Sequence, residues 1–277
     1  MRHLVRAVRA VGMACVVLLP GTMVAQPGER GPIVPLTVPA AARAVVRADS
    51  LFTAGNADAS MAAVREGLRT DGTSFALLWR AARGETMIGI LAADRRVQTQ
   101  HLEQAVALAK RVVSQRPDTA EGYVWLAAAL GRMALRADMR HAAMWGTEAY
   151  AATTRALALD SLHAPAQDIM GKLHSEARKL PWLVRMLAGE IARVPVVRLA
   201  SWERAEHHLQ RALVLDGQLM VAHGDLVQLY LRTGRLAEAE RQLQRMSGIA
   251  PRSPVDRWFL AEAARRVASA RAGKPER

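Results

Sequence analysis

Apolar side chains recur three and four positions apart through almost the whole stretch from Ala40 to Ala272. That spacing places them on one face of an α-helix, whereas a half-buried strand needs strict alternation of apolar and polar residues. No alternating run competes with the helical pattern, and the segments are rich in alanine, leucine and arginine, which favour helices. The sequence therefore predicts an all-α fold.

The helices are arranged in a 34-residue repeat. The stretch 220–253 carries the pattern without a gap, with Leu226 in a first helix, Gly234 in the turn, Ala239 in a second helix and Pro251 at the end. A pair of antiparallel helices of this length, with small residues where the helices approach, is typical of a tetratricopeptide repeat (TPR). Larger side chains at Gly234 or Ala239 are expected to push the two helices apart.

Weaker copies of the repeat begin at Ala41, Phe75, Ala120 and Ala164. In the last three of these copies the second helix arrives eleven, ten and twenty-two residues late, so each pair carries an insertion between its helices. Insertions at one edge of a solenoid leave its stack intact. We therefore predict, over residues 40–272, a TPR-type solenoid of about five helix pairs with long intra-pair insertions. A C-terminal capping helix follows Pro254, and residues 273–277 are expected to be a disordered tail.

Three segments carry a resemblance to a known family: Leu77–Arg83, Ala120–Gly131, and the insertion Leu180–Trp202 with its two prolines and two tryptophans. With these segments and its interrupted pairs, the chain resembles the TPR family of regulators of microtubule dynamics over roughly residues 44–246. The resemblance implies a helical scaffold without a known reaction. Microtubule binding is not expected of a chain that is exported.

The first 25 residues have the order of a secretory signal peptide. Arg2, Arg6 and Arg9 precede the apolar run 11–20, small residues lead to Ala25, and no acidic residue occurs. The apolar run is too short to span a bilayer, for which about 20 residues are needed. We expect cleavage after Ala25, a proline-rich linker at 26–39, and a mature protein in the periplasm or cell envelope. A mitochondrial presequence, also rich in arginine and poor in acids, is the alternative.

The sequence offers no catalytic, cofactor-binding or metal-binding residues. It has no GxxxxGK or GxGxxG loop for phosphates and no HExxH pair for zinc, and its one cysteine lies within the predicted signal peptide. Ser201, Glu203 and His207 suggest a catalytic triad, but Ser201 is better explained as the N-cap of a helix. The formal net charge of +13 is spread along the chain, so nucleic acid is not an expected partner.

The remaining function is binding. In a TPR solenoid the second, fifth, ninth and twelfth places of each first helix face a concave groove, and we expect this groove to hold a protein or peptide partner. An extended peptide with polar and apolar side chains suits the mixed lining, unless the groove is plain solvated surface or is filled by an insertion of the chain itself. The predicted partner-binding residues are Trp79, Arg83, Glu121, Val124, Asp168, Lys172 and Gln228.

The insertion Leu180–Trp202 suggests an alternative function. Pro181 fits the first turn of a helix whose apolar stripe ends at Pro195, and five basic residues surround the stripe with only Glu190 opposed. Such a helix is able to lie on an acidic lipid surface, which would make the chain a peripheral membrane protein. We expect instead that the stripe mainly packs against the solenoid and buries Trp182 and Trp202 at its ends.

Overall fold

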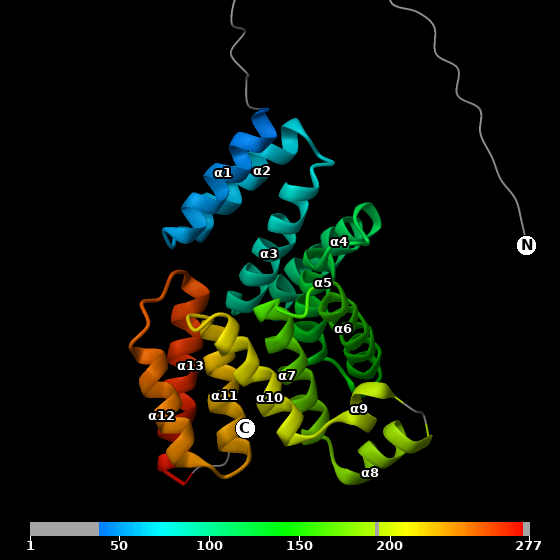
Figure 1. The fold of residues 1–277 in the computed structure, drawn as a ribbon, viewed down its shortest axis with the longest axis vertical. Coiled ribbons are helices and arrows are strands. Elements are labelled where there is room, and N and C mark those ends of the chain that lie inside the picture. Colours follow the sequence, from blue (N-terminus) through cyan, green and yellow to red (C-terminus); the bar gives the residue numbers. More distant parts are fainter. Residues whose placement is uncertain (1–38, 192–193, 274–277) are drawn as a thin grey trace, which may run out of the picture. The chain divides into compact units, whose positions relative to one another are not determined.

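The computed structural model describes residues 39–191 and 194–273, and within these ranges the chain is helical with no strand (Figure 1). Val38–Arg277 forms a compact unit of its own, separate from Met1–Thr37. The predicted all-α fold is confirmed. The predicted signal peptide, the linker up to Val38 and the tail from Lys274 lie outside the described residues.

Five helix pairs and a last helix follow one another along the chain. The first helix of each pair (A helix) packs against the second (B helix), as predicted. The pairs are α1 (Ala40–Thr53) with α2 (Ala57–Thr70), α3 (Phe75–Leu91) with α4 (Arg95–Gln115), α5 (Ala120–Ala134) with α6 (Met139–Leu159), α7 (Ala164–Lys179) with α10 (Trp202–Leu215), and α11 (Met220–Arg232) with α12 (Leu236–Ser247). Helix α13 (Pro254–Arg271) ends the solenoid.

Short polar side chains begin the helices. Asn56, Asp94, Asp138 and Ser253 each accept a hydrogen bond from the backbone N–H three residues further on. Ser201 does the same for Arg204 at 3.1 Å, which confirms its assignment as an N-cap.

Gly234 was expected to be small so that the two helices of the last pair can approach each other, and this reason is wrong. A Cβ built at this residue meets nothing within 4 Å, so its small size does not let the helices approach. Its φ of +75° is what requires glycine, because an L-residue pays a steric cost in that region. Ala239 is fully buried in the core of the last pair, so a larger side chain there is still expected to push the helices apart.

Glycine and alanine permit the closest approach of helices elsewhere. A Cβ on Gly171 of α7 would lie 2.7 Å from Leu209 Cγ and 2.9 Å from the carbonyl oxygen of Ala205, both on α10. In the second pair Ala105 and Ala109 of α4 are completely buried. Small residues at these points bring the backbones together and leave the larger apolar residues to fill the core.

The first two insertions are not loops. They lengthen the helices on both sides of the turn, so that α3 has 17 residues and α4 and α6 have 21 each. The α3–α4 extension is held together by Gln98, whose Nε2 donates to the carbonyl of Gly89 at 3.0 Å. The inserted residues therefore extend the helices and do not form a separate loop.

The third insertion contains α8 (Trp182–Met186), a π-helical turn η1 (Leu187–Ile191) and α9 (Pro195–Leu199). Pro181 immediately precedes α8, and Pro195 starts α9 instead of ending one long helix. Val196 of α9 is buried, and α9 packs on α6 and α7. The expected burial is wrong for Trp182, which is 68% exposed, and for Leu183, which is 48% exposed. Trp202, by contrast, is partly buried and packs against the core of the last helices.

The last helix does more than cap the final pair. Helix α13 packs on α11 and α12, which Figure 1 shows beside it, and also contacts α3. Met87 and Ile90 of α3 pack against the same apolar cluster as Phe259 of α13. Just before α13, a Cβ on Gly55 would lie 2.6 Å from the carbonyl oxygen of Arg252, so the α1–α2 turn touches the α12–α13 loop. The solenoid thus returns on itself within the unit 38–277.

Candidate interaction surface

The seven predicted groove residues separate into two clusters and two isolated positions. Asp168, Lys172 and Gln228 come together where α7 meets α11, and Trp79 and Arg83 come together where α3 meets α1. Val124 and Glu121 of α5 belong to neither cluster.

An ion cluster joins α7 to α11. The Nζ of Lys172 lies 2.7 Å from Asp225 Oδ1 and 3.4 Å from Glu176 Oε1, and it also donates to Gln228. Arg232 Nη1 donates to Glu176 Oε1 at 3.0 Å. The side chains of Asp225 and Arg232 are each only 8% exposed, and Lys172 is 19% exposed. The polar groups that α7 and α11 offer are therefore largely satisfied by one another.

Asp168 lies beside this ion cluster without a full set of partners. It is 4% exposed, and its Oδ1 has no hydrogen-bond partner. Burial raises the pKa of this carboxyl well above its usual value and the charge of Asp225 raises it further, while Lys172 and Arg132 act in the opposite direction. Lys172 therefore pairs with Asp225, and the carboxyl of Asp168 is buried with no hydrogen-bond partner at its Oδ1.

A second cluster joins α3 to α1. Arg80 Nε donates to Asp49 Oδ1 at 2.7 Å, and Arg83 places its guanidinium 3.7 Å from the centre of the Phe52 ring and 5.2 Å from that of Trp79. Burial lowers the pKa of Arg83 to about 10. The hydrogen bonds from Arg80 lower the pKa of Asp49. Trp79 is half-buried, and the guanidinium of Arg80 lies 4.1 Å from the centre of its ring.

The two positions on α5 differ from each other. Val124 is 1% exposed and packs with Ala156 of α6 and Ala166 of α7, so it belongs to the core and lines no surface. Glu121 stands in the first turn of the helix and is half-exposed.

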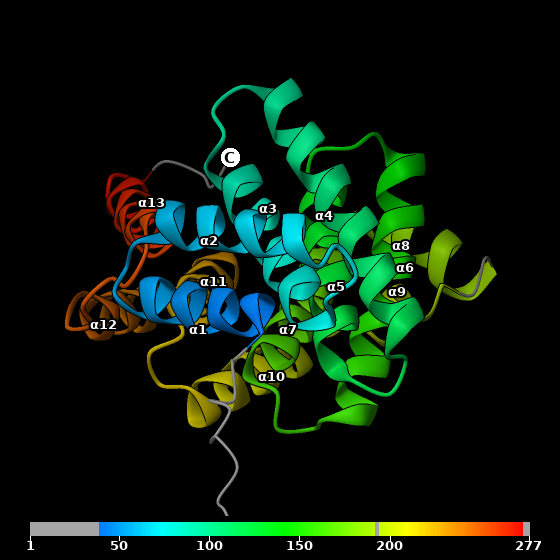
Figure 2. The same ribbon diagram turned by 90° about the horizontal axis from the view of Figure 1, so that it is seen from above.

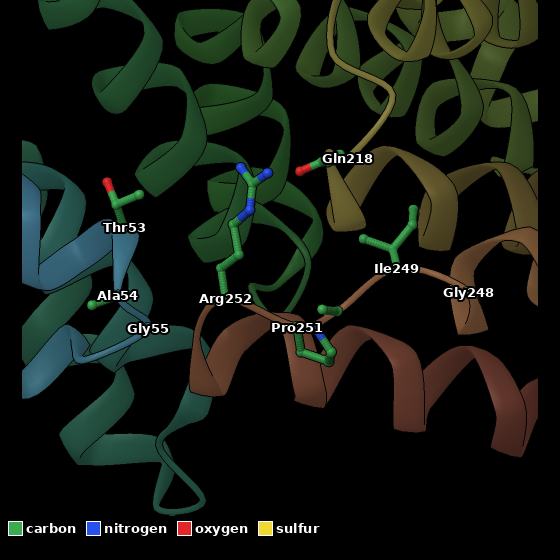
Figure 3. Close-up of a pocket in the computed structure, with 9 residues that line it drawn as sticks. Thr53, Ala54, Gly55, Gln218, Gly248, Ile249, Pro251 and Arg252 are labelled. Atoms are coloured by element: carbon green, nitrogen blue, oxygen red, sulfur yellow. The ribbon is translucent and has the colours of Figure 1, made fainter.

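A cavity of about 390 Å³ lies next to the point where the solenoid returns on itself. Figure 3 shows Arg252 and Gln218 extending toward it between the α1–α2 turn and the loop that precedes α13. None of the seven predicted residues lines it. The described residues also contain no group of three or more histidine, cysteine, aspartate or glutamate side chains that is arranged to hold a metal ion.

Three of the five residues of the ion cluster, Glu176, Asp225 and Arg232, were not predicted from the sequence. Glu176 lies four residues after Lys172, and Asp225, Gln228 and Arg232 lie three or four residues apart on α11, so each set shares a helix face. That spacing was a readable signal of a polar stripe on each helix. The pairing of the two stripes depends on how α7 and α11 pack, which no local pattern specifies.

The comparisons with known proteins agree with this architecture. The family model described as "Regulator of microtubule dynamics protein 1-3" matches residues 44–270. No curated protein sequence matches the chain.

Similar solved structures include TTC0263, a thermophilic TPR protein of Thermus thermophilus, with 21% identity and a TM-score of 0.58 over 81% of this chain and 98% of that one. MamA has 16% identity and a TM-score of 0.40 over 86% of this chain and 97% of that one. A monomeric mutant of IFIT1 with Gppp-AAAA has 17% identity and a TM-score of 0.42 over 73% of this chain and 48% of that one. The likeness to TTC0263 shows a TPR fold.

Proposed function

The chain belongs to the regulator of microtubule dynamics family, and we propose that it is a non-catalytic scaffold that holds a protein or peptide partner. Solenoids of helix pairs bind through extended surfaces built by successive repeats. The sequence supplies no nucleophile, phosphate loop or metal motif that suggests a reaction instead.

The proposal rests on a difference in exposure between the predicted groove residues of the early A helices, α3 and α5, and those of the late ones, α7 and α11. On α7 and α11 the charged groups are paired with one another and mostly buried. On α3, Trp79 is half-exposed beside Arg83, which is itself only 13% exposed and lies 3.9 Å from Asp49, a carboxylate that is 42% exposed. Glu121 is half-exposed on α5. A ring and exposed carboxylates suit an extended peptide with polar and apolar side chains, and we place its binding site on α1, α3 and α5.

The test is the affinity of an identified partner. A partner captured from cell-envelope extract is purified, and its dissociation constant is measured with the wild-type chain, a Trp79→Ala/Glu121→Lys variant and a Val214→Ala control on the exposed side of α10. We expect the first variant to bind about tenfold or more weakly, because an exposed ring at a binding site commonly contributes more than 1 kcal/mol. A variant that melts like wild type and binds with unchanged affinity would remove this surface as the partner site. Lys172→Glu is a poor probe, because it breaks the ion cluster.

We also propose that the protein works outside the cytoplasm, in the periplasm or cell envelope. The proposal is supported by the basic start, apolar run and small-residue end of residues 1–25. N-terminal sequencing of the cell-derived protein is expected to begin at Gln26 in an envelope fraction. An intact Met1 on cytosolic protein rejects export, and mature protein in mitochondria supports the presequence alternative.

A further inference from the structure

The exposed apolar residues gather at the connections between A and B helices. Twelve large hydrophobic side chains are exposed among the described residues, and nine of them lie in or beside the three lengthened connections. Leu91 and Val97 flank the first connection, and Leu135, Met139 and Met144 mark the second. Trp182, Leu183, Met186 and Leu187 belong to the third. The three that remain, Val46, Leu162 and Val214, are scattered.

The first two connections touch each other, and the third insertion contacts the helix that begins at the second connection. Arg95, in the first turn of α4, donates to the carbonyl of Arg136, which follows α5, so the first two connections touch. In the third, α9 packs on α6. In Figure 2, α4, α6, α8 and α9 lie along one side of the unit, away from α12 and α13. We call the residues 91–97, 135–144 and 178–189 the insertion edge.

The four apolar residues of the third connection form one stripe. Trp182 and Leu183 are followed four positions later by Met186 and Leu187, which places all four on one side of the α8–η1 segment. Arg185 fastens the base of the segment, since its Nη1 donates to the carbonyl of Leu180 at 2.6 Å and to that of Arg178 at 3.2 Å, at the end of α7. The hydrogen bonds of Arg185 thus fix the α8–η1 segment at the end of α7, and its four apolar side chains remain exposed.

The charge of the insertion edge is strongly positive. It holds seven basic residues and two acidic ones. Both acids act as helix caps, since Asp94 accepts from the N–H of Val97 at 2.9 Å and Asp138 from that of His141 at 3.1 Å. The arginines of the first two connections, Arg95, Arg96, Arg136 and Arg140, are exposed.

We propose that the insertion edge docks the protein peripherally on an anionic lipid surface. Trp182, Leu183, Met186 and Leu187 enter the boundary between headgroups and acyl chains, and the arginines and Lys179 contact the lipid phosphates. Exposed tryptophan, leucine and methionine beside arginine match this boundary, where amphipathic segments bury their apolar face by roughly 5–10 Å. No described helix is both long and apolar enough to cross a bilayer.

A lipid surface fits better than an acidic protein. The edge is made of three helix connections, and its exposed side chains lie at or near helix ends and in the short segment α8–η1. A fluid lipid surface accepts such separate segments without a matching shape, whereas a protein interface requires complementary packing. The proposal is independent of the peptide site on α1, α3 and α5.

The test is vesicle flotation with the unit 38–277, which contains every core cluster of the described chain and excludes the apolar run of the N-terminus. Phosphatidylcholine vesicles are compared with vesicles in which about a third of the lipid is phosphatidylglycerol. We expect flotation with the anionic vesicles only, and a marked loss of binding when salt rises from about 0.05 to about 0.5 M.

Matched variants locate the contact. Leu183→Glu/Leu187→Glu and, separately, Arg95→Glu/Arg96→Glu are each expected to weaken binding to anionic vesicles about tenfold or more. The Val46→Glu/Val214→Glu control adds the same two negative charges as Leu183→Glu/Leu187→Glu, at exposed apolar sites away from the edge, and is expected to bind much better than that variant. Circular dichroism melting verifies the fold, and Trp182→Ala/Met186→Ala replaces any variant that fails it.

Three results overturn the proposal: no flotation with anionic vesicles, equal flotation with neutral ones, or binding that survives in a folded Leu183→Glu/Leu187→Glu variant. Loss of a protein partner from the edge variants without any vesicle binding would assign the edge to an acidic protein instead.

Discussion

The buried carboxyl of Asp168 lowers the stability of the folded protein. It lies beside Lys172, yet the lysine is bound by Asp225, and the Oδ1 of Asp168 has no partner. Removing a carboxylate from water without enough hydrogen bonds costs free energy, and that cost appears as a raised pKa.

We therefore predict that Asp168→Asn stabilises the protein at neutral pH. The folded pKa of Asp168 lies above its unfolded value near 3.8, so the folded state binds more protons between the two values and the wild type loses stability as pH rises through that window. The amide carries no charge and lacks this loss. Urea unfolding at pH 7 is expected to show a gain of about 1–2 kcal/mol, and the gain shrinks as pH is lowered toward 4.

Asp225→Asn serves as the control, because it removes the negative charge that lies 2.7 Å from the Nζ of Lys172 and is expected to destabilise the protein. An Asp168→Asn protein less stable than wild type at pH 7 would mean that Lys172 and Arg132 hold the carboxylate more strongly than burial opposes it.

The helices show what the sequence specifies and what it leaves open. The pairs were predictable because apolar spacing, small contact residues and the 34-residue period are all local patterns. The outcome of the insertions was less predictable. In the first two the helices lengthen, whereas Pro181 and Pro195 divide the third into short segments. The exposure of Trp182 was not predictable, because the same stripe is equally suited to burial or to solvent.

The candidate site, too, could be predicted from the sequence only in part. Its A-helix positions follow from the repeat, but Val124 is buried because α6 and α7 close over it, and Asp168 and Gln228 are buried where α7 meets α11. Such burial depends on packing between helices that are distant in sequence. The period assigns a residue to a face and does not determine what covers that face.

At the level of a helix pair, we predict that Gly171→Val destabilises the protein by about 1–3 kcal/mol, the usual cost of overpacking. The added Cβ would lie 2.9 Å from the backbone carbonyl of Ala205 as well as 2.7 Å from Leu209 Cγ, so α7 and α10 must separate. Gly131→Ala in α5 is the control, since nothing lies within 4 Å of its added Cβ. Alanine there is expected to stabilise slightly through helix propensity. Equal melting temperatures for the two variants would show that α7 and α10 tolerate the added side chain.

The whole unit differs from an open solenoid because its last helix reaches back to its second pair. In a simple solenoid each repeat contacts only its neighbours, so a local defect loosens only the adjacent repeats. Here Phe259 of α13 belongs to the apolar cluster against which Met87 and Ile90 of α3 pack. The guanidinium of Arg132 on α5 lies 5.2 Å from the centre of the Phe259 ring. A defect in α13 is therefore transmitted to a helix more than 160 residues earlier.

Phe259→Ala tests this closure, and hydrogen exchange measured by mass spectrometry is the readout. The side chain is 7% exposed, and its truncation is expected to cost about 3–5 kcal/mol of unfolding free energy, as for other buried phenylalanines. Exchange should rise in α11 and α12 and also in the second half of α3, while α6 changes little. Arg257→Ala, an exposed position on the same helix, is expected to leave the pattern unchanged. Faster exchange confined to α11, α12 and α13 would mean that the contact with α3 contributes no stability and that the solenoid behaves as an open chain of repeats.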